Sequence, residues 1–321
     1  MDEIIVLLDP VAPATAERLR ALLPPGFALV HATERGEAHL QALIADADYA
    51  ISGQVGVSVA VLGAARRLKL LHKWGVGVDN LDLDAARARG IAVARTTGSN
   101  AVPVGEFAVA LMLAAMRNLA AGHAALQRGE WGSVGGRPAT TLRGKTVGLL
   151  GFGASAQVVA RAVRDGFGCA VLCHKPRPLD PAEERAHGVR WVGFDRLLAD
   201  SHVLSLHCPL TRATAGLLDR AAFERMRPGA VLVNVARAAI VVEADLLWAL
   251  RTGRLGAAAL DVYEPEPLPA DSPLLGLDNL VTTPHIAAAS ADTFGATVAR
   301  MYANIARVSR GEPVAPGDIV A

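Results

Sequence analysis

Cysteine is scarce in this chain and occurs only at Cys169, Cys173 and Cys208. No two of these residues form the CxxC pair typical of a metal site, and a disulfide framework needs more than three cysteines. We therefore expect reduced thiols that pack as small hydrophobic side chains. The histidines show no metal-binding spacing either, so no metal is expected.

Net charge and long hydrophobic runs are also lacking. Because 32 Lys and Arg residues balance 31 Asp and Glu residues, nothing in the overall charge indicates a nucleic-acid or membrane partner. The N-terminal run in MDEIIVLLD is short, acidic at its start and ended by Pro10. The most apolar helical run, over residues 104–119, is interrupted by Glu106 and Arg117. We expect neither a signal peptide nor a membrane span, and we predict a cytoplasmic protein.

Hydrophobic residues, by contrast, make up 52% of the 321 residues, which is enough for substantial buried cores. Short apolar runs alternate with helical patterns from end to end, as is typical of βαβ units with parallel sheets covered on both faces. Strands are predicted at residues 4–8, 28–31, 49–52, 70–73, 146–150, 170–173, 203–206, 231–234 and 257–260. Helices are predicted at residues 14–23, 37–45, 59–65, 102–119, 156–165 and 291–308, with further helices between the strands from residue 203 to residue 260.

This alternation falls into two series, so the chain is predicted to form two Rossmann-like, doubly wound α/β domains. The first domain is expected to cover residues 1–97, with the last helix returning to it so that residues 289–321 belong there as well. The second domain is expected to cover residues 98–288. A glycine-rich stretch over residues 129–144 is predicted to be a loop.

The first strand of the second domain leads directly into the glycine motif GFGASA and then into a helix. In a dinucleotide fingerprint, Gly151 would allow the tight turn and Gly153 would let the backbone approach a pyrophosphate, while Ala156 is small enough for helix–strand packing. The amides of Ala154 and Ser155 would open the helix and face the phosphates, where the helix dipole favours negative charge. A tight turn that binds no ligand is the alternative.

The residues about 20 positions further on bear on the choice of cofactor, because NAD-binding proteins usually carry an acidic ribose ligand there. Here that place is taken by Lys175, preceded by His174 and followed closely by Arg177. This cationic cluster suits a 2′-phosphate, so NADP is favoured over NAD. A solvated basic loop that makes no cofactor contact is the alternative.

Other strand ends of the second domain carry groups that suit the reduction of a 2-oxo acid by hydride. Such a reaction needs a hold on the carboxylate, a polarised carbonyl and a proton donor. The bidentate, always charged Arg237 suits the first two tasks. His285 suits the third if a carboxylate fixes its ring and stabilises the imidazolium. Glu264 and Glu266, which follow one strand, are both candidates for that carboxylate.

The segments NVARAAIV, LDVYEPEPLP and TPHIAAAS, in this order after VGLLGFGASA, resemble the D-isomer-specific 2-hydroxyacid dehydrogenases. This is the family of phosphoglycerate dehydrogenase and glyoxylate/hydroxypyruvate reductase. The segments HKWGVGVDNLDLDAARARGIAVARTTGSNAVPVGE and SLHCPLTRATAGLL are similar to the same family, so the resemblance covers nearly the whole chain. It implies that Arg237 binds the substrate, that Glu266 rather than Glu264 is the supporting carboxylate, and that His285 is the acid/base.

The resemblance implies further contacts and a fold. It places the nicotinamide carboxamide near Asp261. The other implied cofactor contacts are His207, mainly through its backbone, Cys208, Pro209, Thr214, Val235, Ala236 and Ala287. The family fold pairs a flavodoxin-like domain with a dinucleotide-binding domain, with the active site in the cleft between them. Family members are usually dimeric through the cofactor-binding domain, so a homodimer is expected.

The substrate side is expected at strand ends of the first domain. The glycine-rich loop after Lys73 could bind a carboxylate on its exposed amides, and the resemblance assigns this role to Val76 and Gly77. Lys73 is a candidate for a second anionic group, or a solvated lysine, and Ser52 is a weaker pocket candidate. No arginine cluster marks a phosphate site in this domain, which favours glyoxylate or hydroxypyruvate over 3-phosphoglycerate. The chain ends soon after its last helix, so no additional regulatory domain is expected.

The chain departs from the family pattern in three places: Ala238 follows the arginine where glycine is common, Ala156 ends the glycine loop, and Lys175 replaces the acidic ribose ligand. Two other functions fit the same fold. One is a nucleotide-sensing, corepressor-like protein without turnover, although such a protein would not need the whole trio. The other is a sister enzyme that oxidises formate or phosphite.

Overall fold

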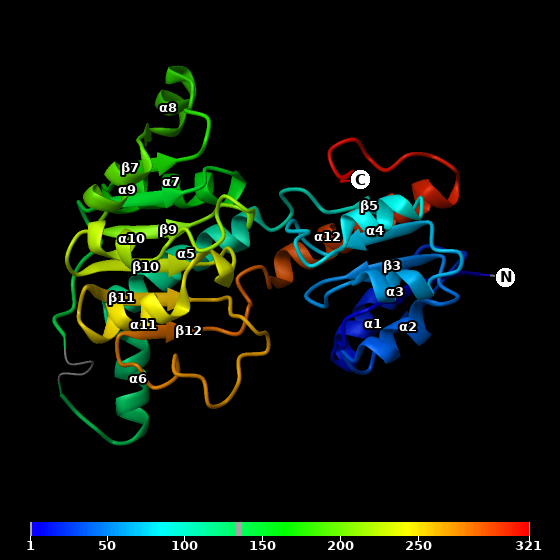
Figure 1. Cartoon of the computed structure of the whole chain (residues 1–321), viewed down its shortest axis with the longest axis horizontal. Helices are drawn as coiled ribbons and strands as arrows, with labels where there is room; N and C mark the ends of the chain where they lie inside the picture. Colours follow the sequence, from blue (N-terminus) through cyan, green and yellow to red (C-terminus); the bar gives the residue numbers. More distant parts are fainter. Residues whose placement is uncertain (1, 133–136, 321) are drawn as a thin grey trace. The chain divides into compact units, whose positions relative to one another are not determined.

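The computed structural model describes residues 2–132 and 137–320 and divides into two compact units. Unit 1 comprises Met1–Asn100 and Ser290–Ala321, and unit 2 comprises Ala101–Ala289. Each unit is a parallel sheet with helices on both faces (Figure 1). The predicted fold class, two doubly wound α/β domains, is confirmed.

Unit 1 contains a five-stranded parallel sheet in the order β2-β1-β3-β4-β5. This is the flavodoxin-like strand order. The strands are β1 (Glu3–Leu7), β2 (Phe27–His31), β3 (Tyr49–Ser52), β4 (Leu70–Lys73) and β5 (Ala92–Ala94). The helices are α1 (Pro13–Ala21), α2 (Glu37–Ile44), α3 (Val59–Ala64), α4 (Leu83–Ala88) and α12 (Ala291–Ser309).

Alternate residues of β1 supply the two cores of unit 1. Ile5 and Leu7 pack in a cluster with Met301 and Tyr302 of α12, whereas Val6 packs on the other face. Since successive side chains of a strand point to opposite faces, a strand buried on both sides must be apolar throughout. The returning helix α12 therefore covers one face of the sheet, and this explains the unbroken apolar run near the N-terminus.

A buried polar network also joins α12 to the sheet of unit 1. The fully buried His72 ring donates from Nδ1 to the Lys73 carbonyl at 2.9 Å and accepts at Nε2 from the Asn304 amide at 3.1 Å. The same amide donates to Asp318 at 3.0 Å, and Arg300 forms an ion pair with Asp318 at 2.6 Å. These hydrogen bonds require a neutral His72 ring, because a proton on Nε2 would face the donor of Asn304.

This network makes unit 1 sensitive to acid. Burial lowers the pKa of His72 from 6.5 to about 4, so between these values the unfolded chain binds a proton that the folded chain does not. We expect the free energy of unfolding to fall as the pH drops through this window, by up to about 1.4 kcal/mol per pH unit. Urea unfolding at pH 7.5, 6 and 5 measures this.

The variant His72→Gln cannot titrate at this position and should flatten the dependence of the free energy of unfolding on pH. Equal slopes for wild type and His72→Gln would contradict the assignment to His72.

Unit 2 contains a seven-stranded parallel sheet in the order β12-β11-β10-β9-β6-β7-β8. Its strands are β6 (Thr146–Leu150), β7 (Ala170–His174), β8 (Arg190–Trp191), β9 (Val203–Leu206), β10 (Ala230–Asn234), β11 (Leu255–Leu260) and β12 (Leu280–Thr282). Its helices are α5 (Ala101–Met116), α6 (Leu119–Gln127), α7 (Ala154–Phe167), α8 (Pro181–His187), α9 (Phe194–Asp200), α10 (Arg220–Arg225) and α11 (Glu243–Arg251), with a short 3₁₀ helix, η1 (Ala238–Ile240).

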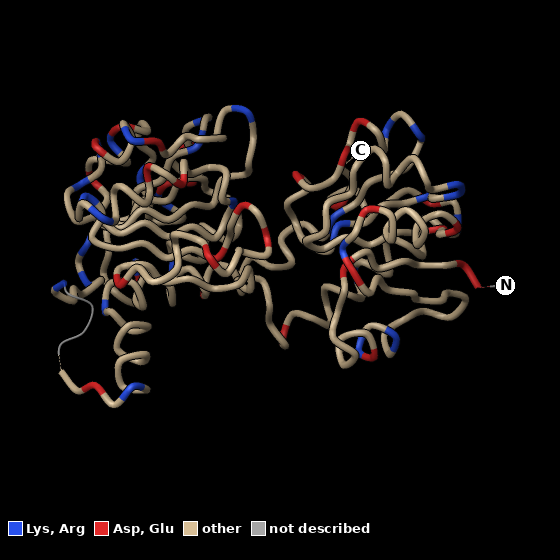
Figure 2. Tube along the Cα trace, turned by 60° about the horizontal axis from the view of Figure 1, so that its bottom comes forward, with Lys and Arg blue, Asp and Glu red and all other residues tan. Residues whose placement is uncertain are grey.

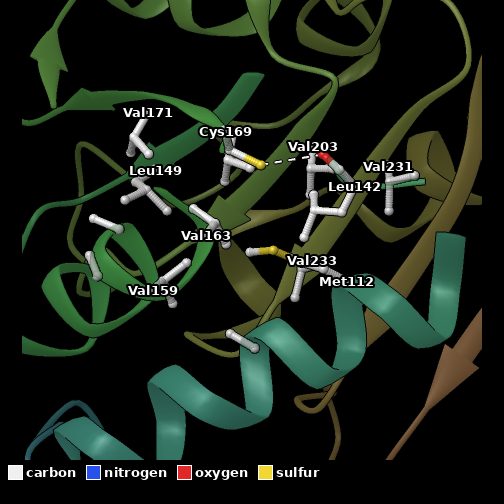
Figure 3. Packing of buried hydrophobic residues seen from close by; sticks show 14 of the residues in the cluster. Met112, Leu142, Leu149, Val159, Val163, Cys169, Val171, Val203, Val231 and Val233 are labelled. Carbon is white, nitrogen blue, oxygen red and sulfur yellow. Dashed lines mark hydrogen bonds between the residues drawn. The ribbon is translucent and has the colours of Figure 1, made fainter. Parts of the chain in front are cut away.

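The central strand β6 pairs with β7 on one side and with β9 on the other, so the strand order reverses at β6. Such a reversal of strand order is the point at which doubly wound folds bind ligands, beyond the carboxyl ends of the strands. Figure 3 shows the core on one face of the sheet, where Leu149 of β6 packs in one cluster with Met112, Val159 and Val163 from α5 and α7.

The structure differs from the sequence-based prediction at several elements. The predicted helix over residues 102–119 ends at Met116, and α6 begins after Asn118, whose φ of 55° is left-handed. The strands β5 and β8 and the helices α4, α8 and α9 are missed by the sequence-based prediction because they have two to seven residues and little periodicity. Within the predicted loop over residues 129–144, residues 133–136 lie outside the part that the structure describes.

Among the described residues, no single helix is long and apolar enough to cross a membrane. α5 and α6 meet the length and composition criteria only when taken together, across a 65° bend. α5 is largely a core helix of unit 2, with Leu111 and Met112 in the buried cluster. Lys and Arg are interspersed with Asp and Glu in both units (Figure 2).

Candidate active site

The glycine loop joins β6 to α7 at the point where the strand order reverses. Gly151 has a φ of 92°, and a Cβ there would lie 2.6 Å from backbone atoms of His207 and Cys208. Both the backbone conformation and the close neighbours therefore require glycine at this position. Gly151 brings the end of β6 against the chain that leaves β9, where His207 donates its N–H to the Leu150 carbonyl at 2.7 Å.

The residues that follow offer donors for a phosphate. Gly153 is the N-cap of the 14-residue α7 and has no side chain to cap the helix, and both Gly153 and Ala154 are exposed. The amides of the first turn are thus available where the helix dipole attracts an anion. Ala156 is fully buried against the sheet, as its predicted packing role requires.

The predicted cationic cluster lies at the end of β7. His174 is half-buried and bonds through Nδ1 to the Val192 carbonyl at 2.9 Å, so its ring is part of the local packing. Lys175 is also half-buried, and its carbonyl accepts from the Trp191 indole at 3.0 Å. Arg177 is exposed. Within the described residues, no ion pair engages the Lys175 or Arg177 side chains, so both charges are available to an anion.

The segment after β9 lies against the glycine loop. The His207 ring bonds to the Ser155 hydroxyl at 3.1 Å and to the Ser205 hydroxyl at 2.9 Å. The Thr214 hydroxyl donates to the Pro209 carbonyl at 2.7 Å, which closes the loop that carries both residues. Burial raises the pKa of the Cys208 thiol to about 11, so Cys208 is an un-ionised thiol at neutral pH.

Glu266 and His285 form the pair that the sequence predicted. The Nδ1 atom of His285 lies 2.7 Å from Oε2 of Glu266, whose Oε1 accepts the Tyr263 N–H at 3.0 Å. Burial opposes ionisation of Glu266, but the hydrogen bonds from His285 and Tyr263, with the nearby charge of Arg237, outweigh it and lower its pKa. Glu266 is thus a carboxylate, whereas Glu264 is exposed.

Arg237 follows β10 and begins η1, in the turn that also contains Val235 and Ala236. Asn234 holds this turn, because its side chain accepts the Ala236 N–H at 3.0 Å and donates to the Arg237 carbonyl at 2.9 Å. The Arg237 guanidinium donates to the Ala236 carbonyl at 2.7 Å and remains partly exposed. The turn therefore presents a positive charge in the same unit as Glu266 and His285.

Asp261 has a structural role that the sequence did not reveal. Its side chain is fully buried and accepts three hydrogen bonds from the loop that carries His285: the Thr283 hydroxyl at 2.6 Å, the Ile286 N–H at 2.9 Å and the Ala287 N–H at 2.8 Å. These bonds offset the cost of burying the carboxylate. They also hold His285 at a left-handed φ of 53°, which is unusual for a side-chain-bearing residue.

The candidate substrate residues of unit 1 lie at the ends of β3 and β4. Lys73 is 6% exposed, and its ammonium bonds to the Gly53 carbonyl and to Asn80 Oδ1 at 2.6 Å. It is therefore not a solvated lysine. The Ser52 hydroxyl is fully buried and donates to the Val55 carbonyl at 2.6 Å, so it fixes its own turn.

The loop after β4 is more open. Val76 and Gly77 are partly exposed, and Gly75 before them has a φ of 141° that favours glycine. Asp9, which the sequence-based prediction did not include, orders the neighbouring loop by accepting the N–H groups of Gly53, Gln54 and Val55. The sequence signal for Asp9 is a carboxylate that follows a buried strand and precedes Pro10.

Within residues 2–132 and 137–320, no group of three or more His, Cys, Asp or Glu side chains could hold a metal ion. The three cysteines are free thiols, and Cys169 and Cys173 are buried. Ser205, which the sequence-based prediction also missed, lies inside the segment SLHCPLTRATAGLL, but only the structure shows its contact with His207.

Comparison with known proteins adds a family. A model described as "D-isomer specific 2-hydroxyacid dehydrogenase, NAD binding domain" matches residues 109–287. The chain is 42% identical over 267 residues to a D-3-phosphoglycerate dehydrogenase from Archaeoglobus fulgidus, which covers 80% of this chain and 49% of that protein. It is 38% identical over 240 residues to a hydroxypyruvate reductase from Thermotoga maritima, which covers 74% of this chain and 76% of that protein. The chain spans about half the length of the curated D-3-phosphoglycerate dehydrogenases that it matches.

Solved structures share the fold of two parallel-sheet α/β domains. The NAD-dependent formate dehydrogenase from Staphylococcus aureus, solved in complex with NAD, superposes with a TM-score of 0.86 at 29% identity. The match covers 99% of this chain and 98% of that chain. The resemblance noted from the motifs is thus confirmed by sequence and by structure.

Proposed function

Because this chain belongs to the D-isomer-specific 2-hydroxyacid dehydrogenase family, we propose that it transfers hydride between a nicotinamide cofactor and a small 2-oxo or D-2-hydroxy acid. The observation that carries the proposal is the hydrogen-bonded pair of Glu266 and His285, in the same unit as the glycine loop. A carboxylate–imidazole pair supplies the proton that carbonyl reduction needs.

The residues of unit 2 fit a dinucleotide. The turn at Gly151 and the uncapped first turn of α7 suit a pyrophosphate, and the amides of Ala154 and Ser155 would hold it. When bound, the nicotinamide would supply the hydride, and the protein would supply binding and orientation.

The trio would act on the substrate as follows. Arg237 binds the 2-oxo acid through its fixed positive charge and polarises the carbonyl. His285 donates a proton to the substrate oxygen from Nε2, because its Nδ1 faces Glu266. The Glu266 carboxylate stabilises the imidazolium until the proton leaves and keeps the ring in one orientation.

For the substrate we propose glyoxylate or hydroxypyruvate rather than 3-phosphoglycerate. The hydroxypyruvate reductase relative aligns over about three quarters of both chains, which supports a small acid. In unit 1 the Lys73 ammonium already bonds to Gly53 and Asn80, so it is engaged in holding the loop. Small differences between acids are worth only about 1–3 kcal/mol in a pocket, so the screen must be broad.

The deciding experiment is a steady-state screen of 2-oxo acids with NADH and NADPH. We expect turnover with glyoxylate or hydroxypyruvate. No turnover with any acid would refute the dehydrogenase and favour a nucleotide sensor. The similarity to a formate dehydrogenase makes formate the second candidate, so NAD⁺ and NADP⁺ reduction by formate and phosphite completes the panel.

For the cofactor we propose NADP, on the basis of the Lys175 and Arg177 charges at the end of β7. Lys175→Asp should lower the NADPH/NADH ratio of kcat/KM by roughly tenfold or more, because it replaces a charge-assisted hydrogen bond to the 2′-phosphate with like-charge repulsion. The ratio is measured with a single 2-oxo acid at constant ionic strength. The control is Arg143→Asp, which reverses an exposed charge before the opposite end of β6. An unchanged ratio in Lys175→Asp would remove the basis for NADP.

We also propose a homodimer that forms through unit 2. α6 and the residues after it expose Leu119 (64%), Leu126 (57%) and Trp131 (93%), an apolar surface that a second copy could cover. Sedimentation should give a mass of about twice 33.4 kDa for the wild type and a monomer for Leu126→Glu. The control is Val59→Glu, which changes an exposed valine of unit 1. A monomeric wild type, or dissociation by both variants, would contradict this interface.

We propose that the protein acts in the cytoplasm. Support comes from its three free cysteines, because a reducing compartment keeps thiols unbridged. Cell fractionation against a periplasmic marker tests this, and recovery with that marker would refute it.

A further inference from the structure

Three polar side chains form a row at the reversal point of the unit 2 sheet. Ser205 lies on β9, His207 follows that strand directly, and Ser155 lies in the first turn of α7. The two serine hydroxyls bond to opposite nitrogens of the ring: Ser205 to Nε2 at 2.9 Å and Ser155 to Nδ1 at 3.1 Å. The row thus runs from the buried sheet to the first turn of α7, directly after the glycine loop.

The burial of Ser205 decides the direction of the protons in this row. Its hydroxyl is fully buried and, within the described residues, His207 Nε2 is its only hydrogen-bond partner. A buried hydroxyl that leaves its proton unbonded loses about 1–3 kcal/mol, so Ser205 donates and Nε2 accepts. A neutral imidazole has one N–H, which must then be on Nδ1 and be donated to Ser155 Oγ.

The neutral state of the ring agrees with its surroundings. Burial lowers the pKa of His207 to about 4, so the ring carries one proton at neutral pH. The backbone on both sides is fixed as well, because His207 N–H bonds to the Leu150 carbonyl and its own carbonyl lies against Gly151. The ring therefore has little freedom to exchange one partner for another.

Ser155 is left with one unused donor. Its oxygen accepts from His207, and within the described residues no second partner takes its proton. The residue is partly exposed in the first turn of a 14-residue helix whose N-cap contributes no side chain. A hydroxyl that accepts a hydrogen bond also becomes a better donor, since hydrogen bonds in a chain strengthen one another.

We infer that the Ser155 hydroxyl donates to a pyrophosphate oxygen of the dinucleotide, and that Ser205 and His207 are positioning residues that keep its proton turned toward that oxygen. This inference rests on the proposed function, because it assumes a dinucleotide at the glycine loop. It goes beyond the amide contacts of a glycine loop, and it assigns a task to a serine that the backbone motif does not require.

The test is the dissociation constant of NADPH and NADH, measured by cofactor fluorescence without any substrate. Ser155→Ala should weaken binding about tenfold, the usual cost of one hydrogen bond to a charged oxygen. Ser205→Ala should weaken it as well, because the ring can then move its proton to Nε2 and accept the Ser155 proton at Nδ1. The double variant should bind no more weakly than Ser155→Ala, since both changes remove the same donor.

Two controls separate this effect from general destabilisation. Ser201→Ala also removes a fully buried hydroxyl of unit 2, one that donates to the Leu197 carbonyl at 2.5 Å, and should leave both constants unchanged. In ¹⁵N-histidine spectra, His207 of the wild type should carry its proton on Nδ1, and Ser205→Ala should shift it toward Nε2.

The outcomes distinguish this inference from the proposed function. Wild-type affinity in Ser205→Ala, additive losses in the double variant, or an Nε2–H tautomer in the wild type would overturn the positioning role. Normal binding constants without turnover of any 2-oxo acid would overturn only the proposed dehydrogenase activity. A chain that binds neither cofactor would overturn both.

Discussion

His285→Gln should lower kcat for the reduction of a 2-oxo acid by roughly 10²- to 10⁴-fold, the usual contribution of a positioned general acid. Glutamine can still hydrogen-bond to Glu266 but cannot release a proton to the substrate oxygen. Because His285 lies on the loop after β12 whereas the glycine loop follows β6, the dissociation constant of NADPH should stay within about twofold of the wild type. Steady-state turnover and fluorescence titration measure the two quantities separately.

The two neighbouring glutamates provide a matched comparison. Glu266→Gln removes the charge that stabilises the imidazolium and should also lower kcat, whereas the exposed Glu264→Gln should not. If His285→Gln turned over at a near-wild-type rate, His285 would have no part in the proton transfer. If the two glutamate variants behaved alike, the choice of Glu266 would be wrong.

The loop that carries His285 shows how far sequence can lead at this site. The motif TPHIAAAS was sufficient to propose the histidine, and the choice between two glutamates came from family resemblance. The three hydrogen bonds from this loop to Asp261 were not predictable, because they depend on a left-handed backbone at His285 that brings the Ile286 and Ala287 amides to one carboxylate. The sequence only showed an acidic residue at a strand end.

The same limit applies to the fold. The strands β3, β4, β6 and β9 have the predicted bounds, because each is a short, almost entirely buried run. The division of helix α5 from α6 was missed, since a single left-handed residue, Asn118, interrupts an otherwise continuous apolar pattern. Local periodicity indicates which segments are buried, but the backbone conformation of one residue depends on its tertiary contacts.

The partners of polar side chains are the least predictable part of the site. The sequence predicts Lys73 to be an anion ligand or a solvated lysine, but its ammonium donates hydrogen bonds to the Gly53 carbonyl and the Asn80 side chain. Ser52 was considered for a pocket, yet its hydroxyl bonds to Val55 within the same turn. Each side chain has a backbone carbonyl among its partners, and a sequence does not show where a carbonyl lies.

Gly151→Ala should weaken NADPH binding by roughly 100-fold and also lower the melting temperature. An alanine Cβ would lie 2.6 Å from Cys208 N and from His207 C, which are backbone atoms that cannot rotate away. The φ of 92° adds strain of about 1–3 kcal/mol. Relief requires that the turn move away from the chain after β9, and this would misplace the amides that face the pyrophosphate.

Two other glycines of the same region separate stability from binding. Gly153→Ala meets no atom within 4 Å and has an ordinary φ of −92°, so it should leave the melting temperature unchanged and weaken only cofactor binding, where a methyl group would meet the phosphates. Gly166→Ala, inside α7 and also free of neighbours within 4 Å, should change neither binding nor fold except for a slight gain in stability. Calorimetry of the three variants with and without NADPH measures both effects. Wild-type affinity and melting temperature in Gly151→Ala would mean that the turn can accept a side chain, and the glycine loop would then lose its assigned role in holding the dinucleotide.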